Sequence, residues 1–144
     1  MDERVAPLNR FAAEEYEGAV AAAQGARLRL GLIGSGLVGA TFAYTVLLRG
    51  LASEIVIIDI NRDKAEGDVM DLNHAMPFTQ PAVIRAGDYG DLANADVVVI
   101  AAGAAQKPGE TRLDLVKKNT RIFRDIITSL TAVNQHAVLL IATN

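Results

Sequence analysis

From Leu28 onward, short apolar runs alternate along the chain with longer stretches whose apolar residues recur every three or four positions. The short runs are rich in β-branched residues and predict strands, whereas the longer stretches predict amphipathic helices. This alternation is typical of parallel βαβ units. The predicted strands are residues 28–33, 54–60, 82–86, 97–101 and 137–142, and the predicted helices are residues 37–49, 62–76 and 111–131.

The run VVVIA, residues 97–101, is apolar at every position. A strand with one face in water alternates apolar with polar residues, so a continuous apolar run indicates a sheet that is covered on both faces. We therefore expect an α/β fold of the Rossmann type, with a doubly wound, mostly parallel sheet of about five strands. The helix predicted over residues 111–131 carries an apolar stripe made of Leu113, Val116, Phe123, Ile126, Ile127 and Leu130.

Residues 1–26 differ in kind from the rest of the chain. They are rich in alanine and glutamate, with apolar residues at helical spacing, and Pro7 and Gly25 stand near the two ends. Proline near the start and glycine near the end are the usual punctuation of a helix. We expect an amphipathic helical extension here, ahead of a single domain over residues 27–144. Such a stripe favours packing on the chain's own domain, and packing on a partner subunit is the alternative.

Composition narrows the possible classes of protein. The chain of 144 residues is long enough for one well-buried domain. Apolar residues make up 51% of it, but no apolar run is long enough to cross a bilayer, so we expect a soluble domain without a membrane span. The formal charge of −3 gives no electrostatic reason to bind nucleic acid. The chain has no cysteine, which excludes disulfides and thiolate metal sites, and it begins without a signal-peptide pattern. We therefore expect a cytoplasmic location.

Three glycines, spaced Gly34-x-Gly36-x-x-Gly39, lie between the first predicted strand and the helix that follows it. Glycines mark turns everywhere, so a plain tight turn is the alternative to a dinucleotide site. In this context Gly34 permits a tight turn, Gly36 lets the backbone approach a pyrophosphate, and Gly39 lets the helix lie close to the strand. The helix N-terminus behind them offers free N–H groups and a partial positive charge to phosphates.

Asp59 closes the second predicted strand, about 20 residues after the last of these glycines. A carboxylate at this position accepts hydrogen bonds from both ribose hydroxyls and repels a 2′-phosphate, so the sequence favours NAD over NADP as the cofactor. Arg62 and Lys64 lie close by in the sequence and could soften this preference. The alternative interpretation of Asp59 is an acid at a solvated strand end.

The loop over residues 101–111 joins a predicted strand to a helix at the carboxyl end of the sheet, where open α/β folds bind ligands. Pro108-Gly109 predicts a turn within it, and Thr111-x-x-Asp114 predicts a capping box that opens the next helix. A loop with such stops could close over a ligand.

Four segments appear in order along the chain: GSGLVG, EIVIIDINRDKAEGDVMDLNHAMPF, AGAAQKPGETRLDLVKKNTRIFRDI and LLIATN. With these motifs, residues 27–144 resemble the N-terminal half of a bacterial L-lactate dehydrogenase. The resemblance implies a domain that binds NAD in an oligomeric enzyme, which transfers hydride between NADH and pyruvate to give lactate. By position, it implies NAD contacts at Gly34, Gly36, Val38, Gly39, Asp59, Lys64, Tyr89, Gly103, Ala104, Ala142, Thr143 and Asn144.

The resemblance also implies residues that act on the substrate. Arg112 matches the loop arginine that polarises the substrate carbonyl as hydride moves, and Asn144 is the second residue implied in catalysis. Gln106 matches the position that separates lactate from malate dehydrogenases. A second substrate carboxylate calls for an arginine there, so the glutamine favours pyruvate, and a malate dehydrogenase relative is the weaker alternative.

The same resemblance places the proton-exchanging histidine, its orienting acid and a second, carboxylate-clamping arginine beyond Asn144. We interpret the two histidines of the chain, His74 and His136, as structural. We therefore expect a chain without a substrate domain, which binds NAD with little turnover of pyruvate and exposes apolar surface along its fifth strand. A non-catalytic NAD-binding or scaffold module, suggested by the N-terminal helix, is the alternative.

Overall fold

A computed structural model describes residues 28–106 and 108–143, so the predicted N-terminal helix, Lys107 and Asn144 lie outside the described residues. The predicted order of strands and helices is confirmed over the described part. The elements are β1 (Arg29–Ile33), α2 (Leu37–Leu48), β2 (Glu54–Ile58), α3 (Arg62–Ala75), the 3-10 helix η1 (Met76–Phe78), β3 (Val83–Ala86), the 3-10 helix η2 (Tyr89–Leu92), β4 (Val97–Ile100), α4 (Arg112–Val133) and β5 (Val138–Ile141).

The five strands form one sheet in the order β3-β2-β1-β4-β5, and every neighbouring pair is parallel. The chain moves outward from β1 through β2 to β3, and then crosses to the other side of β1 to lay down β4 and β5. The order of strands therefore reverses between β1 and β4. In a doubly wound sheet, the crevice for a ligand lies at the carboxyl ends of the strands at this reversal.

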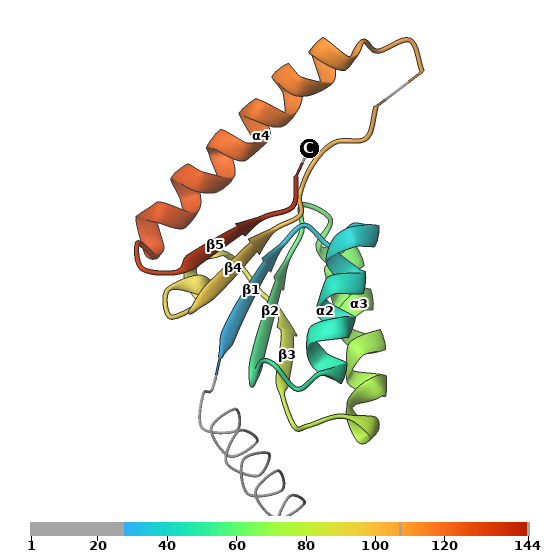
Figure 1. Ribbon diagram of the computed structural model, residues 1–144, viewed down its shortest axis with the longest axis vertical. Coiled ribbons are helices and arrows are strands. Elements are labelled where there is room, and N and C mark those ends of the chain that lie inside the picture. The colour runs from blue at the N-terminus through green and yellow to red at the C-terminus, as the bar shows by residue number, and fades with distance from the viewer. Residues whose placement is uncertain (1–27, 107, 144) are drawn as a thin grey trace, which may run out of the picture.

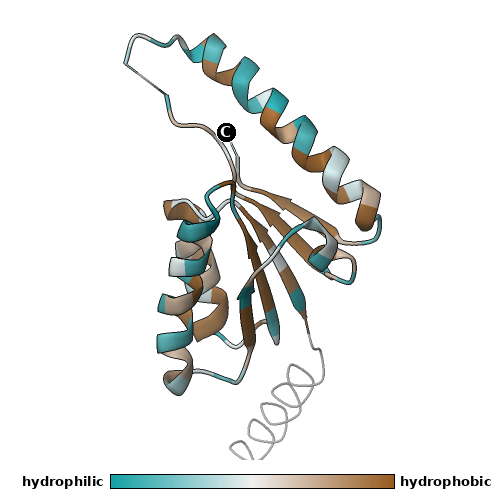
Figure 2. Cartoon of the chain, turned by 180° about the vertical axis from the view of Figure 1, so that it is seen from behind, coloured by the Kyte–Doolittle hydropathy of each residue, from teal (hydrophilic) through white to brown (hydrophobic). Residues whose placement is uncertain are grey.

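Helices cover both faces of the sheet, as the apolar run of β4 predicts (Figure 1). Helices α2 and α3 lie on one face and α4 lies on the other. Two buried apolar clusters result, and β4 contributes to both, with Val99 facing the α2 and α3 side and Val98 and Ile100 facing the α4 side. The apolar colouring of the strands in Figure 2 follows from this two-sided burial.

Helix α4 differs in part from the expectation drawn from its apolar stripe. Ile126 and Leu130 are buried against the sheet, but Leu113 is 64% exposed and Val116 is 53% exposed. The reason is geometric, because the first turns of α4 extend beyond the carboxyl ends of the strands (Figure 1). The stripe gives the direction of the buried face, and the length of the sheet decides how much of it is covered.

Candidate dinucleotide-binding site

A cleft of about 680 Å³ opens at the carboxyl ends of β1, β2 and β4, at the reversal of strand order. The strand ends form one wall of this cleft, and the face of α4 that turns toward the sheet forms the other. This volume lies within the range of small-molecule and cofactor sites. The lining residues are Ile33, Gly34, Gly36, Ile58, Asp59, Ile60, Lys64, Tyr89, Ala101, Ala102, Gly103, Ala104, Ile122, Asp125, Ile126 and Ser129.

The glycine turn lines this cleft through Gly34 and Gly36, and its three glycines meet different surroundings. Gly34 has a φ of 99°, and a Cβ there would lie 2.4 Å from the backbone nitrogen of Ala102. A Cβ on Gly39 would lie 2.0 Å from the carbonyl oxygen of Gly34, so only glycine lets α2 pack this close to the turn. A Cβ on Gly36 would meet no atom within 4 Å. Gly36 therefore leaves open a space beside the cleft that a side chain would fill.

Helix α2 begins directly after this turn, with Gly36 as its N-cap. The N-cap has no side chain to accept a hydrogen bond, and the first turn of α2 contains no acidic residue. The first N–H groups of a helix have no acceptor within the helix and carry the positive end of the helix dipole. The turn and α2 together therefore provide a site for a phosphate anion.

Asp59 follows β2 and its carboxylate is held at the edge of the cleft by backbone groups. One oxygen accepts a hydrogen bond from the N–H of Ser35 at 2.7 Å, and the other accepts one from the N–H of Asn61 at 2.9 Å. Each carboxylate oxygen has a second lone pair that can accept a further hydrogen bond. Asp59 is therefore fixed where it can accept hydrogen bonds from the hydroxyls of a ribose.

Lys64 lines the cleft, but its ammonium is already bound within the protein. It donates to the carbonyl oxygen of Ser35 and to the carboxylate of Asp68, the latter at 2.7 Å. Asp68 also accepts a hydrogen bond from the hydroxyl of Ser35. Burial raises the pKa of the Asp68 carboxyl, but the hydrogen bonds from Lys64 and Ser35 and the lysine charge outweigh it, so the pKa lies below its ordinary value.

Sequence reasoning missed Asp68 and the part that Ser35 has in this network. The i,i+4 spacing of Lys64 and Asp68 on one helix face predicts their ion pair. The hydrogen bond between Ser35 and Asp68 joins residues 33 positions apart, and it depends on α3 packing beside the glycine turn.

Tyr89 enters the cleft from η2, which a network of charged residues holds in place. Asp88 and Asp91 form a capping box around the short helix, and the carboxylate of Asp91 lies 2.6 Å from the guanidinium of Arg85. Hydrogen bonding to the backbone of Asp88 and to Arg85 lowers the pKa of Asp91. Burial, with a smaller contribution from the negative charge of Asp125, raises the pKa of the Tyr89 hydroxyl, so the phenol is neutral at physiological pH.

Gly103 and Ala104 line the third side of the cleft, after β4. The backbone N–H of Ala104 donates to the side-chain oxygen of Asn119 at 2.8 Å. Asn119 is buried on α4, and the sequence did not single it out. A polar residue on the apolar stripe of a helix, three positions after Val116 and four before Phe123, is the sequence signal that could have drawn attention to it.

The end of β5 lies against the same turn. The N–H of Ala142 donates to the carbonyl oxygen of Ile100 at 2.9 Å, and the hydroxyl of Thr143 donates to that of Ala102 at 2.7 Å. Neither residue lines the cleft itself.

Gln106 and Arg112 are not among the residues that line the cleft. The side-chain amide of Gln106 donates to the carbonyl oxygen of Glu110 at 2.8 Å, within the loop, and Gly109 takes a φ of 83°, as expected for the predicted turn. Arg112 is exposed as the first residue of α4, at the end of a loop that rises away from the sheet (Figure 1). Val38, in the first turn of α2, is 60% exposed and also lies outside the lining.

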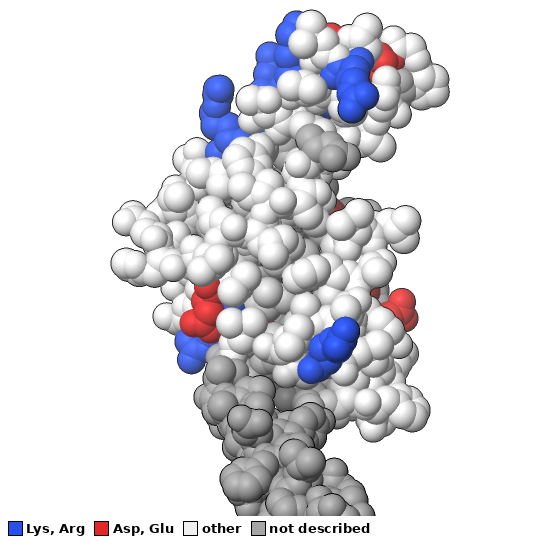
Figure 3. Space-filling model, in the orientation of Figure 1, with Lys and Arg blue, Asp and Glu red and all other residues white. Residues whose placement is uncertain are grey.

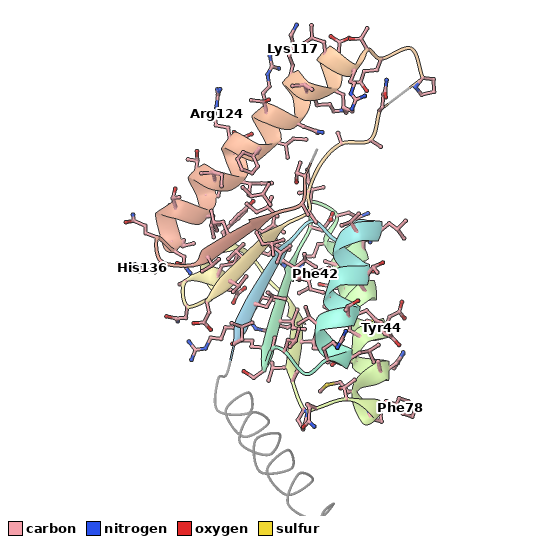
Figure 4. All side chains as sticks on the ribbon, viewed as in Figure 1. Phe42, Tyr44, Phe78, Lys117, Arg124 and His136 are labelled. Atoms are coloured by element: carbon pink, nitrogen blue, oxygen red, sulfur yellow. The ribbon has the colours of Figure 1, made fainter. Side chains whose placement is uncertain are left out.

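The two histidines lie away from the cleft. His74 is in the last turn of α3. His136 lies between α4 and β5, at the opposite end of α4 from Lys117 (Figure 4). Within residues 28–106 and 108–143, no cluster of acidic and histidine side chains could hold a metal ion. Over the same ranges, no helix is both long enough and apolar enough to cross a membrane.

A family model described as the lactate/malate dehydrogenase NAD binding domain matches residues 28–144. The chain belongs to the lactate/malate dehydrogenase family. Its cofactor is NAD, and the residues of the cleft fit this cofactor, with an anion site at the open Gly36 and an anchored carboxylate at Asp59. The predicted fold class, family and cofactor are thus confirmed.

Relatives within the lactate/malate dehydrogenase family are similar over about four fifths of the chain. The chain is 59% identical over 116 residues to an L-lactate dehydrogenase of Thermoanaerobacter sp. (strain X514), covering 81% of this chain and 37% of the relative. It is 57% identical over 113 residues to an L-lactate dehydrogenase of Acetivibrio thermocellus, covering 78% and 36%. The chain therefore spans a little over a third of the length of these curated relatives.

Solved structures of lactate dehydrogenases share the fold. A lactate dehydrogenase from a Medee basin deep-sea metagenome library superposes with a TM-score of 0.78 at 39% identity, covering 82% of this chain and 38% of that one. The minor L-lactate dehydrogenase of Enterococcus mundtii superposes with a TM-score of 0.77 at 38% identity, covering 81% and 38%.

Proposed function

We propose that this chain is the NAD-binding portion of an L-lactate dehydrogenase, an enzyme that transfers hydride between NADH and pyruvate. The observation that carries the proposal is the cleft itself. An unobstructed glycine at a helix N-terminus and a fixed carboxylate stand on one wall, in a chain whose relatives are named L-lactate dehydrogenases.

The chain's own residues have separate tasks in this proposal. The backbone N–H groups at the start of α2 bind the pyrophosphate, and Asp59 accepts hydrogen bonds from the adenosine ribose. Bound NAD supplies the acceptor or donor of the hydride. In this proposal Gly103 and Ala104, the latter held by Asn119, contact the nicotinamide end of the cofactor. Ala142, Thr143 and Asn144 join them there as the resemblance of the sequence implies.

Arg112 and Gln106 act on the substrate in this proposal. The guanidinium of Arg112 stabilises negative charge that develops on the carbonyl oxygen of pyruvate as hydride moves. The loop with Gln106 and the first turn of α4 with Arg112 have to approach the cleft for this contact, because neither residue lines the cleft in the structure. Gln106 carries no charge, so it favours the methyl group of pyruvate over the second carboxylate of oxaloacetate.

Calorimetric titration of NADH into the purified 144-residue chain tests the cofactor site. We expect saturable binding, weakened roughly tenfold or more by Asp59→Ala, because that change removes the carboxylate that accepts from the ribose. Asp63→Ala is the matched control, since it removes an exposed acid four residues away that does not line the cleft. Binding that is absent, or indifferent to Asp59→Ala, would contradict the proposal.

We further propose that the chain alone turns over pyruvate slowly or not at all. The reaction needs a group that exchanges a proton with the substrate oxygen, and within the described residues neither His74 nor His136 lines the cleft. Oxidation of NADH by the purified chain, followed with and without pyruvate, tests this part. We also propose that the protein forms a homo-oligomer and is located in the cytoplasm, as expected from the sequence.

A further inference from the structure

Ser35 is fully buried between the first two glycines of the turn, and each of its polar groups has a partner. Its N–H donates to Asp59, its hydroxyl donates to Asp68, and its carbonyl oxygen accepts from Lys64. Asp68 also binds Lys64, so it touches Ser35 directly and through the lysine.

The contact between Lys64 and the carbonyl oxygen of Ser35 fixes the orientation of the Ser35–Gly36 peptide group. The structure has no cis peptide among the described residues, and in a planar trans peptide the C=O and N–H groups point in opposite directions. Because the carbonyl of Ser35 points at the lysine ammonium, the N–H of Gly36 points away from it. This N–H is the first of the donors at the start of α2.

Asp68 could affect the binding of a pyrophosphate through its charge or through the position of the turn, and its negative charge makes these two effects easy to separate. A carboxylate near an anion site repels the anion, so charge alone predicts that removing Asp68 tightens the binding of a pyrophosphate. If Asp68 instead holds the turn in shape, its removal frees Lys64 and Ser35 and weakens the binding. The two accounts predict changes of opposite sign.

We propose that Asp68 is a positioning residue for the cofactor's pyrophosphate, because it fixes Lys64 and Ser35 and so holds the Ser35–Gly36 peptide with its N–H available to the phosphate. Asp68 itself does not line the cleft, and it acts only through these two neighbours. The inference rests on the proposed function, since it concerns the same NAD site.

The test measures the dissociation constants of NADH for the full chain and for Asp68→Ala. We expect the dissociation constant to rise about tenfold in the variant, the effect of losing one charge-assisted hydrogen bond between the cofactor's phosphate and the N–H of Gly36. Glu66→Ala is the matched control, because it breaks the exposed Arg62–Glu66 pair of the same spacing on the same helix without touching Ser35. We expect Glu66→Ala to bind as the parent chain does and Asp68→Glu to recover most of the lost affinity.

Two further measurements separate positioning from a general loss of structure. ADP-ribose contains the pyrophosphate and adenosine does not. Asp68→Ala should therefore weaken the binding of ADP-ribose and leave the binding of adenosine, followed by NMR titration, unchanged. In a double-mutant cycle with Ser35→Ala, the loss of binding free energy in the double variant should be smaller than the sum of the losses in the two single variants. The reason is that Asp68 acts partly through the hydroxyl of Ser35.

The outcomes distinguish this inference from the proposed function. If the parent chain fails to bind NADH, the proposed function fails. If the parent chain binds NADH, the proposed function stands. The positioning role of Asp68 is then overturned if Asp68→Ala binds NADH as tightly as the parent chain or more tightly, or if its affinity for adenosine falls as much as its affinity for ADP-ribose.

Discussion

Gly36 and Gly39 stand three residues apart in one turn, yet a side chain would meet different surroundings at the two positions. Gly39 is needed for folding, because a side chain there would collide with the backbone of Gly34. Gly36 meets no such obstacle, and its backbone angles, φ −69° and ψ −175°, are open to any residue. We therefore propose that the absence of a side chain at Gly36 serves the ligand and not the fold.

Substituting alanine at each glycine separates these two requirements. We expect Gly39→Ala to lower the free energy of unfolding by about 2 kcal/mol or more, because the backbone has to move to admit the Cβ. We expect Gly36→Ala to cost no more than about 1 kcal/mol, the difference between glycine and alanine as an N-cap, but to weaken NADH binding roughly tenfold or more.

Denaturant unfolding and calorimetry on the same preparations give both quantities for each variant. Gly67→Ala is the control, since a Cβ at this position on α3 also meets no atom within 4 Å and Gly67 does not line the cleft. A Gly36→Ala variant that binds NADH as tightly as the parent chain would show that this space is not where the pyrophosphate lies.

At the scale of elements, the start of α4 decides how the loop with Gln106 is joined to the rest of the domain. Thr111 and Asp114 form the predicted capping box. The N–H of Asp114 donates to the hydroxyl of Thr111 at 3.2 Å, and the N–H of Thr111 donates to the carboxylate of Asp114 at 3.3 Å. The first turns of α4 lie beyond the sheet, so these local bonds hold them where tertiary packing does not.

Thr111→Ala removes the side chain that caps α4. We expect a loss of about 1 kcal/mol in the free energy of unfolding and faster hydrogen exchange at the amides of the first turn. Thr120→Ala is the matched control, because the hydroxyl of Thr120 only donates to a carbonyl within α4, and alanine is the better helix former. Equal protection of the first turn in Thr111→Ala and in the parent chain would mean that the capping box does not hold this end.

At the scale of the whole molecule, charge and apolar surface are unevenly distributed. Figure 3 shows basic side chains over the first turns of α4 and a broad uncharged area across the middle of the same face. β5 is an edge strand of the sheet, and its four residues are between 39% and 66% exposed. The sequence predicts this apolar exposure along the fifth strand, and an exposed apolar edge strand favours pairing with another chain.

We therefore expect the 144-residue chain to associate as its concentration rises. Val138→Lys should reduce this association, because a lysine on an edge strand opposes pairing and Val138 is 66% exposed. Leu51→Lys is the control, since Leu51 is similarly exposed at 58% but lies in the connection between α2 and β2. Size-exclusion chromatography with light scattering measures the effect, and association that responds equally to both substitutions would not involve the edge of β5.

The sequence alone determined the elements and their type, because the periods of apolar residues and the cap residues are local signals. It placed each strand and each α-helix of the described residues to within about two residues, and it identified the glycine turn, Asp59 and the capping box at Thr111, but it did not predict the 3-10 helices η1 and η2. These features depend on residues close together in the chain. Local physical chemistry, such as backbone freedom and helix capping, is therefore enough to predict them.

Only the tertiary structure decided which of these residues meet. It brought Asp68 to Ser35, Asn119 to the turn after β4, and Arg85 to the short helix that carries Tyr89. It also left Gln106 and Arg112 outside the cleft lining. Such contacts depend on how α3 and α4 pack on the sheet and where their ends fall relative to it. A hydrogen bond between residues 33 positions apart follows from that packing, and no local pattern in the sequence encodes it.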